Sequence, residues 1–257
     1  MGGRSSVGKG GFGRKRHGAV FSRTMLDRTK VRAISLDLDD TLWPIWPTIA
    51  RAETALQDWL RDRAPATAHL MADSAVRHGL REQAQLLHPA LGHQLSALRT
   101  EMIRLALARC AEDVALAEPA YEVFFEARLQ VDLFDDALPA LTALAARYPL
   151  VALSNGNADV GRMGLGHFFS ASLSAERLGF GKPDARIFAA AAQAVGVQAH
   201  EVLHIGDDAA LDVLGALASG MQTVWVNRED HLWTHEARPH ETVTRLDELP
   251  PLLFDLG

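Results

Sequence analysis

Short apolar runs alternate with stretches of helical periodicity over most of the chain. The first run, at Ile34, Leu36 and Leu38, has the spacing of a buried strand. Further strands are predicted at 150–153, 171–174, 202–205, 221–226 and 242–244, and helices at 138–147, 184–195, 209–219 and 246–253. Strands separated by helices pair in parallel through right-handed crossovers. The pattern therefore predicts an α/β fold with a doubly wound, Rossmann-like parallel sheet.

Residues 44–130 follow a different pattern, because apolar residues recur there at helical spacing and no strand is indicated. Four helices are predicted, at about 49–60, 67–78, 94–110 and 119–129. The second is expected to stop at Gly79, since glycine commonly follows a helix end. We therefore expect an α-helical cap domain at 44–130, inserted into a core that is made of 31–43 and 131–257.

The composition is that of a globular chain. Of the 257 residues, 48% are hydrophobic and 23% are charged, and no uninterrupted apolar run reaches the roughly 18 residues of a transmembrane helix. Cys110 is the only cysteine, so neither an internal disulfide nor a cysteine-based metal cage can form. We expect a cytoplasmic protein that has no membrane partner.

The charge is distributed unevenly. Residues 1–30 hold eight Lys or Arg against one acid, a net charge of +7, which leaves −13 on the remainder of a chain whose total is −6. Six of the first thirteen residues are glycine, a composition typical of disordered tails. We predict a disordered tail at 1–30, with the folded protein starting near Met25. A basic arm for nucleic acid is the less favoured alternative.

Acidic residues follow the first predicted strand directly, in the string Asp37-Leu-Asp39-Asp40-Thr41. Acids are not buried unless they are paired or hold a metal. The carboxyl ends of parallel strands open onto the ligand crevice, and alternation places Asp37 and Asp39 on the same side. One carboxylate could serve as nucleophile and metal ligand and the other as proton donor or acceptor. A helix cap is the plainer alternative, and it is the interpretation that we favour for Asp40.

Polar clusters follow other predicted strands and one loop. Their members are Ser154 and Asn155, Lys182, and Asp207 and Asp208 with Asp212. Ser154 and Lys182 can donate hydrogen bonds and positive charge to phosphate oxygens. Carboxylates from two strands, Asp37 and Asp207, are suitable ligands for Mg²⁺. The sequence therefore predicts one crevice that brings a phosphate and a metal together.

In the order and spacing of these four clusters, the chain from Val31 onward resembles the haloacid dehalogenase-like hydrolase superfamily. The resemblance implies that Asp37 is a nucleophile that forms an aspartyl-phosphate, and that Asp39 is the general acid and then the base. It also implies the remaining roles. Mg²⁺ is held by the carboxylates of Asp37 and Asp207 and the backbone carbonyl of Asp39, the phosphoryl group is bound by Thr41, Ser154, Asn155 and Lys182, and Asp208 and Asp212 give support.

The same resemblance narrows the reaction. The dehalogenases of the family lack the second acid of the first motif, and Asp39 is present here, so the resemblance implies a phosphatase with a small phosphorylated substrate. The opening motif is most similar to a bacterial branch that includes phosphatases of flavin mononucleotide and of a phosphorylated riboflavin precursor. A phosphomutase, a dehalogenase and a catalytically silent binding protein stay open as alternatives. A monomer or a homodimer is expected.

Two side chains near the first motif allow two interpretations each. Trp43 and Trp46 lie where the chain leaves the first strand, and they could stack on a ring of the substrate or pack between cap and core. His204 lies two residues before Gly206 in an apolar run, where a buried core histidine is favoured over a catalytic one.

Overall fold

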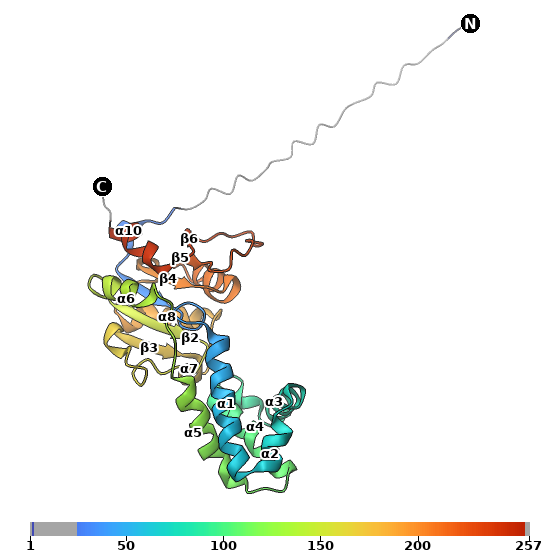
Figure 1. Ribbon diagram of the computed structural model, residues 1–257. Coiled ribbons are helices and arrows are strands. Elements are labelled where there is room, and N and C mark those ends of the chain that lie inside the picture. Colours follow the sequence, from blue (N-terminus) through green and yellow to red (C-terminus); the bar gives the residue numbers. More distant parts are fainter. Residues whose placement is uncertain (1, 3–24, 255–257) are drawn as a thin grey trace.

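The computed structural model describes residue 2 and residues 25–254. One parallel sheet of six strands, in the order β3-β2-β1-β4-β5-β6, forms the centre of the larger part of the molecule (Figure 1). The strands are β1 (Ala33–Leu36), β2 (Leu150–Ser154), β3 (Ala171–Ser174), β4 (Val202–Gly206), β5 (Gln222–Val226) and β6 (Glu241–Val243). Ile34 of the central strand pairs with Leu150 on one side and Leu203 on the other. The predicted doubly wound parallel sheet is confirmed.

Helices cover both faces of this sheet. They are α6 (Ala137–Ala145), α7 (Ala175–Leu178), α8 (Ala185–Ala194), α9 (Gly215–Ala218), which follows a π-helical segment at Ala209–Leu214, and α10 (Leu249–Phe254). Because side chains alternate along a strand, Ile34 and Leu36 contribute to a core with α6 and α10, whereas Ala33 contributes to a second core with α8 and α9. Both faces of the sheet are therefore buried, as a parallel sheet requires.

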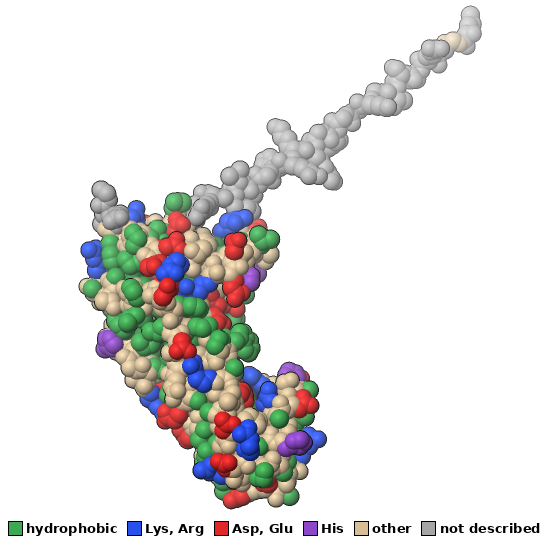
Figure 2. Space-filling view, viewed as in Figure 1, with side chains coloured by type: hydrophobic (Ala, Val, Ile, Leu, Met, Phe, Trp, Pro, Cys, Tyr) green, Lys and Arg blue, Asp and Glu red, His purple; other side chains and the backbone are tan. Residues whose placement is uncertain are grey.

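The segment between β1 and α6 is helical. It contains α1 (Ile45–Arg63), α2 (Pro65–Met71), α3 (Ser74–Leu87), α4 (Leu95–Arg109) and α5 (Ala117–Arg128). The long helices α1 and α5 lie side by side, one leaving the sheet and one returning to it (Figure 1). The segment has a hydrophobic core of its own, and the molecule narrows where this segment joins the sheet (Figure 2).

One of the predicted helices in this segment is placed wrongly. The predicted helix at 67–78 is divided at Ala72, because the Asp73 carboxylate accepts a hydrogen bond from the Ala75 amide and starts a new helix. That helix, α3, continues through Gly79 despite the cost of about 1 kcal/mol for a glycine in a helix interior. The segment consequently has five α-helices where four were predicted.

The first helix of the segment begins earlier than predicted. It starts at Ile45, because the Asp40 carboxylate accepts a hydrogen bond of 2.9 Å from the Ile45 amide. This agrees with the capping role that the sequence favours for Asp40. Asp40 has a φ of 59°, in the left-handed region that aspartate tolerates better than most residues.

Most of the predicted tail at 1–30 lies outside the described residues. Its last four residues correct the prediction, since Asp27 and Arg28 bond to the core and Arg28–Lys30 form a 3₁₀ turn. The Asp27 amide donates to Gln222 Oε1 at 2.7 Å, and the Arg28 guanidinium donates to the Leu252 carbonyl. Within the described part of the chain, no helix has the length and apolarity needed to cross a membrane.

A buried carboxylate connects three loops around the sheet. Asp136, which is 1% exposed, accepts two hydrogen bonds of 3.0 Å from the Arg228 guanidinium and one of 2.7 Å from the Leu246 amide. The same guanidinium donates to the carbonyl of Thr41, just after the first motif. Asp136 therefore holds in place the loop that follows β5 and, through it, the backbone beside the predicted site.

We expect Asp136→Ala to lower the free energy of unfolding by roughly 3 kcal/mol, because it leaves the Arg228 charge and a buried amide without their partner. Urea unfolding followed by circular dichroism measures this value. The neighbouring Asp135 is a matched control, since its side chain is 81% exposed and its ion pair with Arg245 is a surface one. Equal effects of Asp135→Ala and Asp136→Ala would contradict the expectation.

Candidate active site

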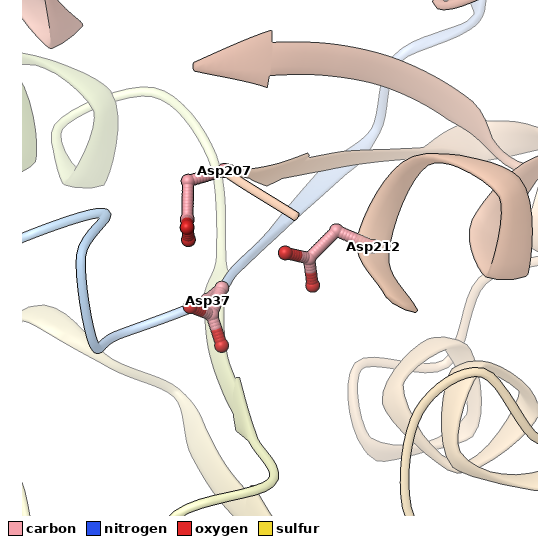
Figure 3. A group of neighbouring side chains, drawn as sticks. All are labelled: Asp37, Asp207 and Asp212. Atoms are coloured by element: carbon pink, nitrogen blue, oxygen red, sulfur yellow. The ribbon is translucent and has the colours of Figure 1, made fainter. Parts of the chain in front are cut away.

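Three carboxylates converge at the carboxyl ends of the two central strands. Asp37 follows β1, Asp207 follows β4, and Asp212 lies on the π-helical segment after β4 (Figure 3). One oxygen of each lies within 4.8 Å of the others. The Asp37 amide donates to the Ile205 carbonyl at 2.9 Å, which continues the pairing of the two strands past their ends. The position is the crevice that open parallel sheets offer to ligands.

Lys182 neutralises two of these carboxylates. It lies in the loop between α7 and α8, is buried, and its ammonium group donates to Asp37 Oδ1 and, at 2.6 Å, to Asp212 Oδ1. Burial alone would lower the pKa of Lys182, but the charges of Asp212 and Asp37 raise it above its ordinary value. The lysine is therefore charged in the fold, although it is removed from water.

Asn155 holds the backbone of this lysine. Its Oδ1 accepts from the Lys182 amide at 2.7 Å, and its Nδ2 donates to the Lys182 carbonyl at 2.8 Å. A Cβ on Gly181 would lie 2.5 Å from Asn155 Oδ1, so only glycine allows this approach. Asn155 was predicted to bind the phosphoryl group. The structure shows its amide bonded to the lysine backbone.

Asp212 is held by three donors. Its Oδ1 accepts from Lys182 and lies 3.1 Å from His204 Nε2, and its Oδ2 accepts from the Asp208 amide at 3.0 Å. Burial opposes ionisation, but the Lys182 charge and the His204 hydrogen bond hold the pKa of Asp212 below its ordinary value. With both oxygens in use, Asp212 is suited to hold Lys182 in place.

His204 belongs to the core, as the sequence analysis favours. Its Nδ1 lies 2.8 Å from the Ser35 hydroxyl and its Nε2 faces Asp212, and all three side chains are buried. Burial lowers the pKa of His204, so the ring is neutral and donates its Nε2 proton to the carboxylate.

Asp37 and Asp207 have raised pKa values, in contrast to Asp212. Burial raises the pKa of Asp37 well above its ordinary value, and the negative charges of Asp212 and Asp207 add to this against the opposing charge of Lys182. Burial, followed by the charge of Asp212, raises the pKa of Asp207 to about 7. Three acids thus face one ammonium group. The carboxylates outnumber the positive charge, and their oxygens are the ligands that a hard cation prefers.

The hydroxyl groups near the site have different partners. Thr41 was predicted to bind the phosphoryl group. Its side chain is buried, its hydroxyl donates to Asp207 Oδ1 at 2.9 Å, and it does not line the cleft. Ser154 accepts from the Gly156 amide at 2.8 Å, which leaves its proton for an acceptor such as a phosphate oxygen. Asp208 caps the helical segment after β4, since it accepts from the amides of Ala210 and Leu211.

Asp39 is held by two side chains, Trp43 and Arg128, and only Trp43 was singled out from the sequence. Its Oδ1 accepts from the Arg128 guanidinium at 2.6 Å and from the Trp43 indole at 2.9 Å. Trp43 is fully buried, so it packs at the site and cannot stack on a substrate. Trp46 is 76% exposed and lines a cavity of about 420 Å³ that Asp207 and Arg228 also line. Arg128 looks in the sequence like an ordinary basic residue of a helix end, and no linear signal pairs it with Asp39.

The residues around Asp37 enclose a cleft of about 170 Å³. It is lined by Asp37, Asp39, Ser154, Asn155, Gly156, Lys182, Asp207, Asp208, Leu211 and Asp212. Apart from Thr41, which lies behind Asp207, every predicted site residue therefore lines one cleft. The cleft therefore holds an ion-paired aspartate and, two residues later, a second aspartate, at the end of a central parallel strand.

Comparison with known proteins identifies the family. The model of the haloacid dehalogenase-like hydrolases matches residues 31–220. The chain is 32% identical to the 5-amino-6-(5-phospho-D-ribitylamino)uracil phosphatase YigB of Escherichia coli over 87% of this chain and 97% of that protein. It is 34% identical to a phosphoserine phosphatase of Thermus thermophilus over 62% of this chain and 67% of that one.

A solved structure agrees with this result. The crystal structure of a 2-haloacid dehalogenase from Pseudomonas syringae pv. Tomato superposes with a TM-score of 0.83 at 35% identity, covering 88% of this chain and all of that one. The chain belongs to the haloacid dehalogenase-like hydrolase family. Its curated relatives support a hydrolase that acts on phosphate esters.

The buried His204 makes a testable contribution to stability. Because its pKa is lower in the fold than in the unfolded chain, the unfolded state takes up the additional proton as the pH falls below about 6.5. This contribution is complete above that pH and is lost at a rate of at most about 1.4 kcal/mol per pH unit below it.

We therefore expect the loss of unfolding free energy between pH 7.5 and pH 5.5 to be smaller in His204→Asn than in the unmodified chain, as measured by urea unfolding. His200→Asn is the control, because that side chain is exposed on the surface. Identical losses in all three proteins would show that His204 does not titrate on unfolding.

Proposed function

We propose that the chain is a magnesium-dependent phosphomonoesterase that acts on a small phosphorylated metabolite through an aspartyl-phosphate at Asp37. The observation that carries the proposal is the buried Asp37 carboxylate, which contacts Lys182 and neighbours Asp207, with Asp39 beside it in the same cleft. Phosphoryl transfer needs mainly positioning and charge stabilisation, and these groups supply both.

The chain's own residues account for both halves of the reaction. In the first, a carboxylate oxygen of Asp37 attacks the phosphorus, the bond to the ester oxygen breaks, and Asp39 gives its proton to the leaving alcohol. In the second, Asp39 removes a proton from water, which attacks the same phosphorus, releases phosphate and restores the Asp37 carboxylate. Lys182 and the Ser154 hydroxyl would donate to the phosphoryl oxygens.

The acids of the cleft are suited to Mg²⁺. The carboxylates of Asp37 and Asp207 and the backbone carbonyl of Asp39 would hold it, whereas both oxygens of Asp212 already accept hydrogen bonds. The raised pKa values of Asp37 and Asp207 agree with this: burial raises both, the charges of neighbouring carboxylates add to it, and a bound cation would stabilise the ionised forms. When bound, Mg²⁺ neutralises charge that develops on the phosphoryl oxygens.

For the substrate, we propose a phosphate ester of a polyol that bears a planar ring, as in a phosphorylated riboflavin precursor or flavin mononucleotide. The support is the similarity to the 5-amino-6-(5-phospho-D-ribitylamino)uracil phosphatase YigB of Escherichia coli, which extends over 97% of that protein. The helical segment 44–130 would act as the cap that selects this substrate. A cytoplasmic location and a monomeric or homodimeric state stay predictions.

Dehalogenation of a 2-haloacid is the second candidate, which the similarity to the Pseudomonas syringae structure favours. Displacement of a halide needs no proton donor. The presence of Asp39 in the cleft therefore supports the phosphatase. Chloride release from 2-chloropropionate, compared with phosphate release under the same conditions, discriminates between the two.

The two acids of the first motif have separable effects on turnover. We expect Asp37→Asn to abolish phosphate release and Asp39→Asn to reduce it by roughly 10²–10⁴-fold, because the second variant loses only proton transfer. The assay measures phosphate from flavin mononucleotide, nucleotides, sugar phosphates and phosphoglycolate, with Mg²⁺ and with a chelator.

Asp40→Asn is the matched control, since Asp40 bonds to the Ile45 amide and its variant should keep most of the activity. Unchanged rates in Asp37→Asn would refute the assignment of the nucleophile. A panel without any phosphate release would shift the proposal to a mutase or to a silent binding protein, and a salt-dependent shift of DNA or RNA by the full chain would favour the latter.

Magnesium affinity should depend on pH. Because the pKa of Asp207 is about 7 without metal, Mg²⁺ has to displace a proton from that carboxyl in more acidic solution. We expect the affinity to fall by up to about tenfold per displaced proton for each pH unit below pH 7. Calorimetric titration of Mg²⁺ in two buffers of different ionisation enthalpy measures both affinity and proton release. A shallower pH dependence in Asp207→Asn is expected, and an affinity that is equal at pH 6 and pH 8 would contradict the expectation.

A further inference from the structure

Arg128 is a buried cation in an unusual position. It is the last residue of α5, where the helical segment returns to the sheet, and it is 1% exposed. An arginine is rarely removed from water unless it is paired, because desolvation of a charge is costly. Its partner is Asp39, at 2.6 Å between Nη2 and Oδ1, and the sequence separation is 89 residues. The pair therefore joins the helical segment to the first motif.

The contacts of Asp39 fix the orientation of its carboxylate. Oδ1 accepts from both Arg128 and Trp43, whereas Oδ2 lies on the side of Gly156, where an added Cβ would be only 2.6 Å away. Gly156 and Asp39 line the same cleft as Asp37. One oxygen is thus anchored away from the reaction, and the other lies along the wall of the cleft.

Among the described residues, Arg128 has no ion-pair partner other than Asp39. Its Nη1 is buried without a hydrogen bond among the described residues, so the ion pair with Asp39 is the contact that compensates its charge. A displacement of α5 would carry the guanidinium away from Asp39 and leave a buried charge unpaired. The seating of the helical segment on the sheet is in this way coupled to the orientation of one carboxylate.

We propose that Arg128 is a positioning residue for proton transfer: it holds Asp39 so that Oδ2 faces the leaving-group oxygen, and it does so only when the helical segment is seated on the sheet. The proposal rests on the proposed function, in which Asp39 protonates the leaving alcohol. It concerns geometry, since Arg128 lies behind the carboxylate and does not need to touch the substrate.

Leaving-group dependence separates this role from a merely structural one. An alkyl phosphate needs protonation of its leaving oxygen, whereas p-nitrophenyl phosphate releases a stabilised phenolate and needs little. We expect Arg128→Gln to lower kcat roughly 10- to 100-fold for the fastest alkyl phosphate of the panel, and to lower it far less for p-nitrophenyl phosphate. KM for the alkyl phosphate should stay nearly unchanged, and Arg128→Lys should restore part of the loss.

Arg162→Gln is the matched control. Arg162 also joins α5 to the sheet domain, through an ion pair with Glu126, but it is exposed and does not contact Asp39. Its variant should leave the ratio of the two kcat values unchanged. Trp43→Phe removes the other donor to the same oxygen, so a smaller change in that ratio is expected, and it provides a second readout where Arg128→Gln does not fold.

A double variant completes the test. Once Asp39 is replaced by asparagine, adding Arg128→Gln should cause little further loss with the alkyl phosphate, because the group being positioned is gone. Equal losses for both substrates in the Arg128 variants, or additive losses in the double variant, would overturn the positioning role. Activity retained in Asp37→Asn would instead refute the proposed function, so the two failures are distinguishable.

Discussion

The site depends on one buried ammonium group. Lys182 stands between Asp37 and Asp212, and without it three carboxylates would meet at the ends of two buried strands with nothing to offset their charge. Several other features serve this lysine: Asn155 holds its backbone, Gly181 allows the approach, and His204 and the Asp208 amide hold Asp212. Burial, together with the charges of neighbouring carboxylates, leaves Asp37 and Asp207 with raised pKa values, so a cation bound between them would stabilise their ionised forms.

The parallel sheet and the helical segment contribute different parts of the site. The parallel sheet supplies Asp37 and Asp207 from the ends of two strands that hydrogen bonding holds in register, and Asp212 comes from the π-helical segment that follows β4. The helical segment has its own core and joins the sheet through the ends of α1 and α5 (Figure 1). Arg128 lies at that junction, so the point where the sheet and the helical segment meet is also the point where Asp39 is oriented.

Much of this follows from the sequence, because the relevant signals are local. A short apolar run that ends in Asp37, or in Asp207, indicates a buried strand with its acid at the crevice, and the structure places both strands there. The features that were missed depend on contacts across the chain. The pairs of Arg128 with Asp39 and of Arg228 with Asp136 join residues 89 and 92 positions apart, and neither has a local pattern. The predicted helix end at Gly79 is wrong, and the break at Asp73 was missed. The Asp73 carboxylate caps a new helix there, and that helix continues through Gly79.

The central claim is that the phosphoryl group of the substrate is transferred to the Asp37 carboxylate. The most direct measurement is a single turnover with the fastest substrate, quenched in acid, reduced with borohydride and analysed by peptide mass spectrometry. Borohydride converts an aspartyl-phosphate to homoserine, so homoserine at residue 37, formed only with substrate present, is the result that the account predicts. Turnover without any change at residue 37, or modification at a different residue, would contradict it.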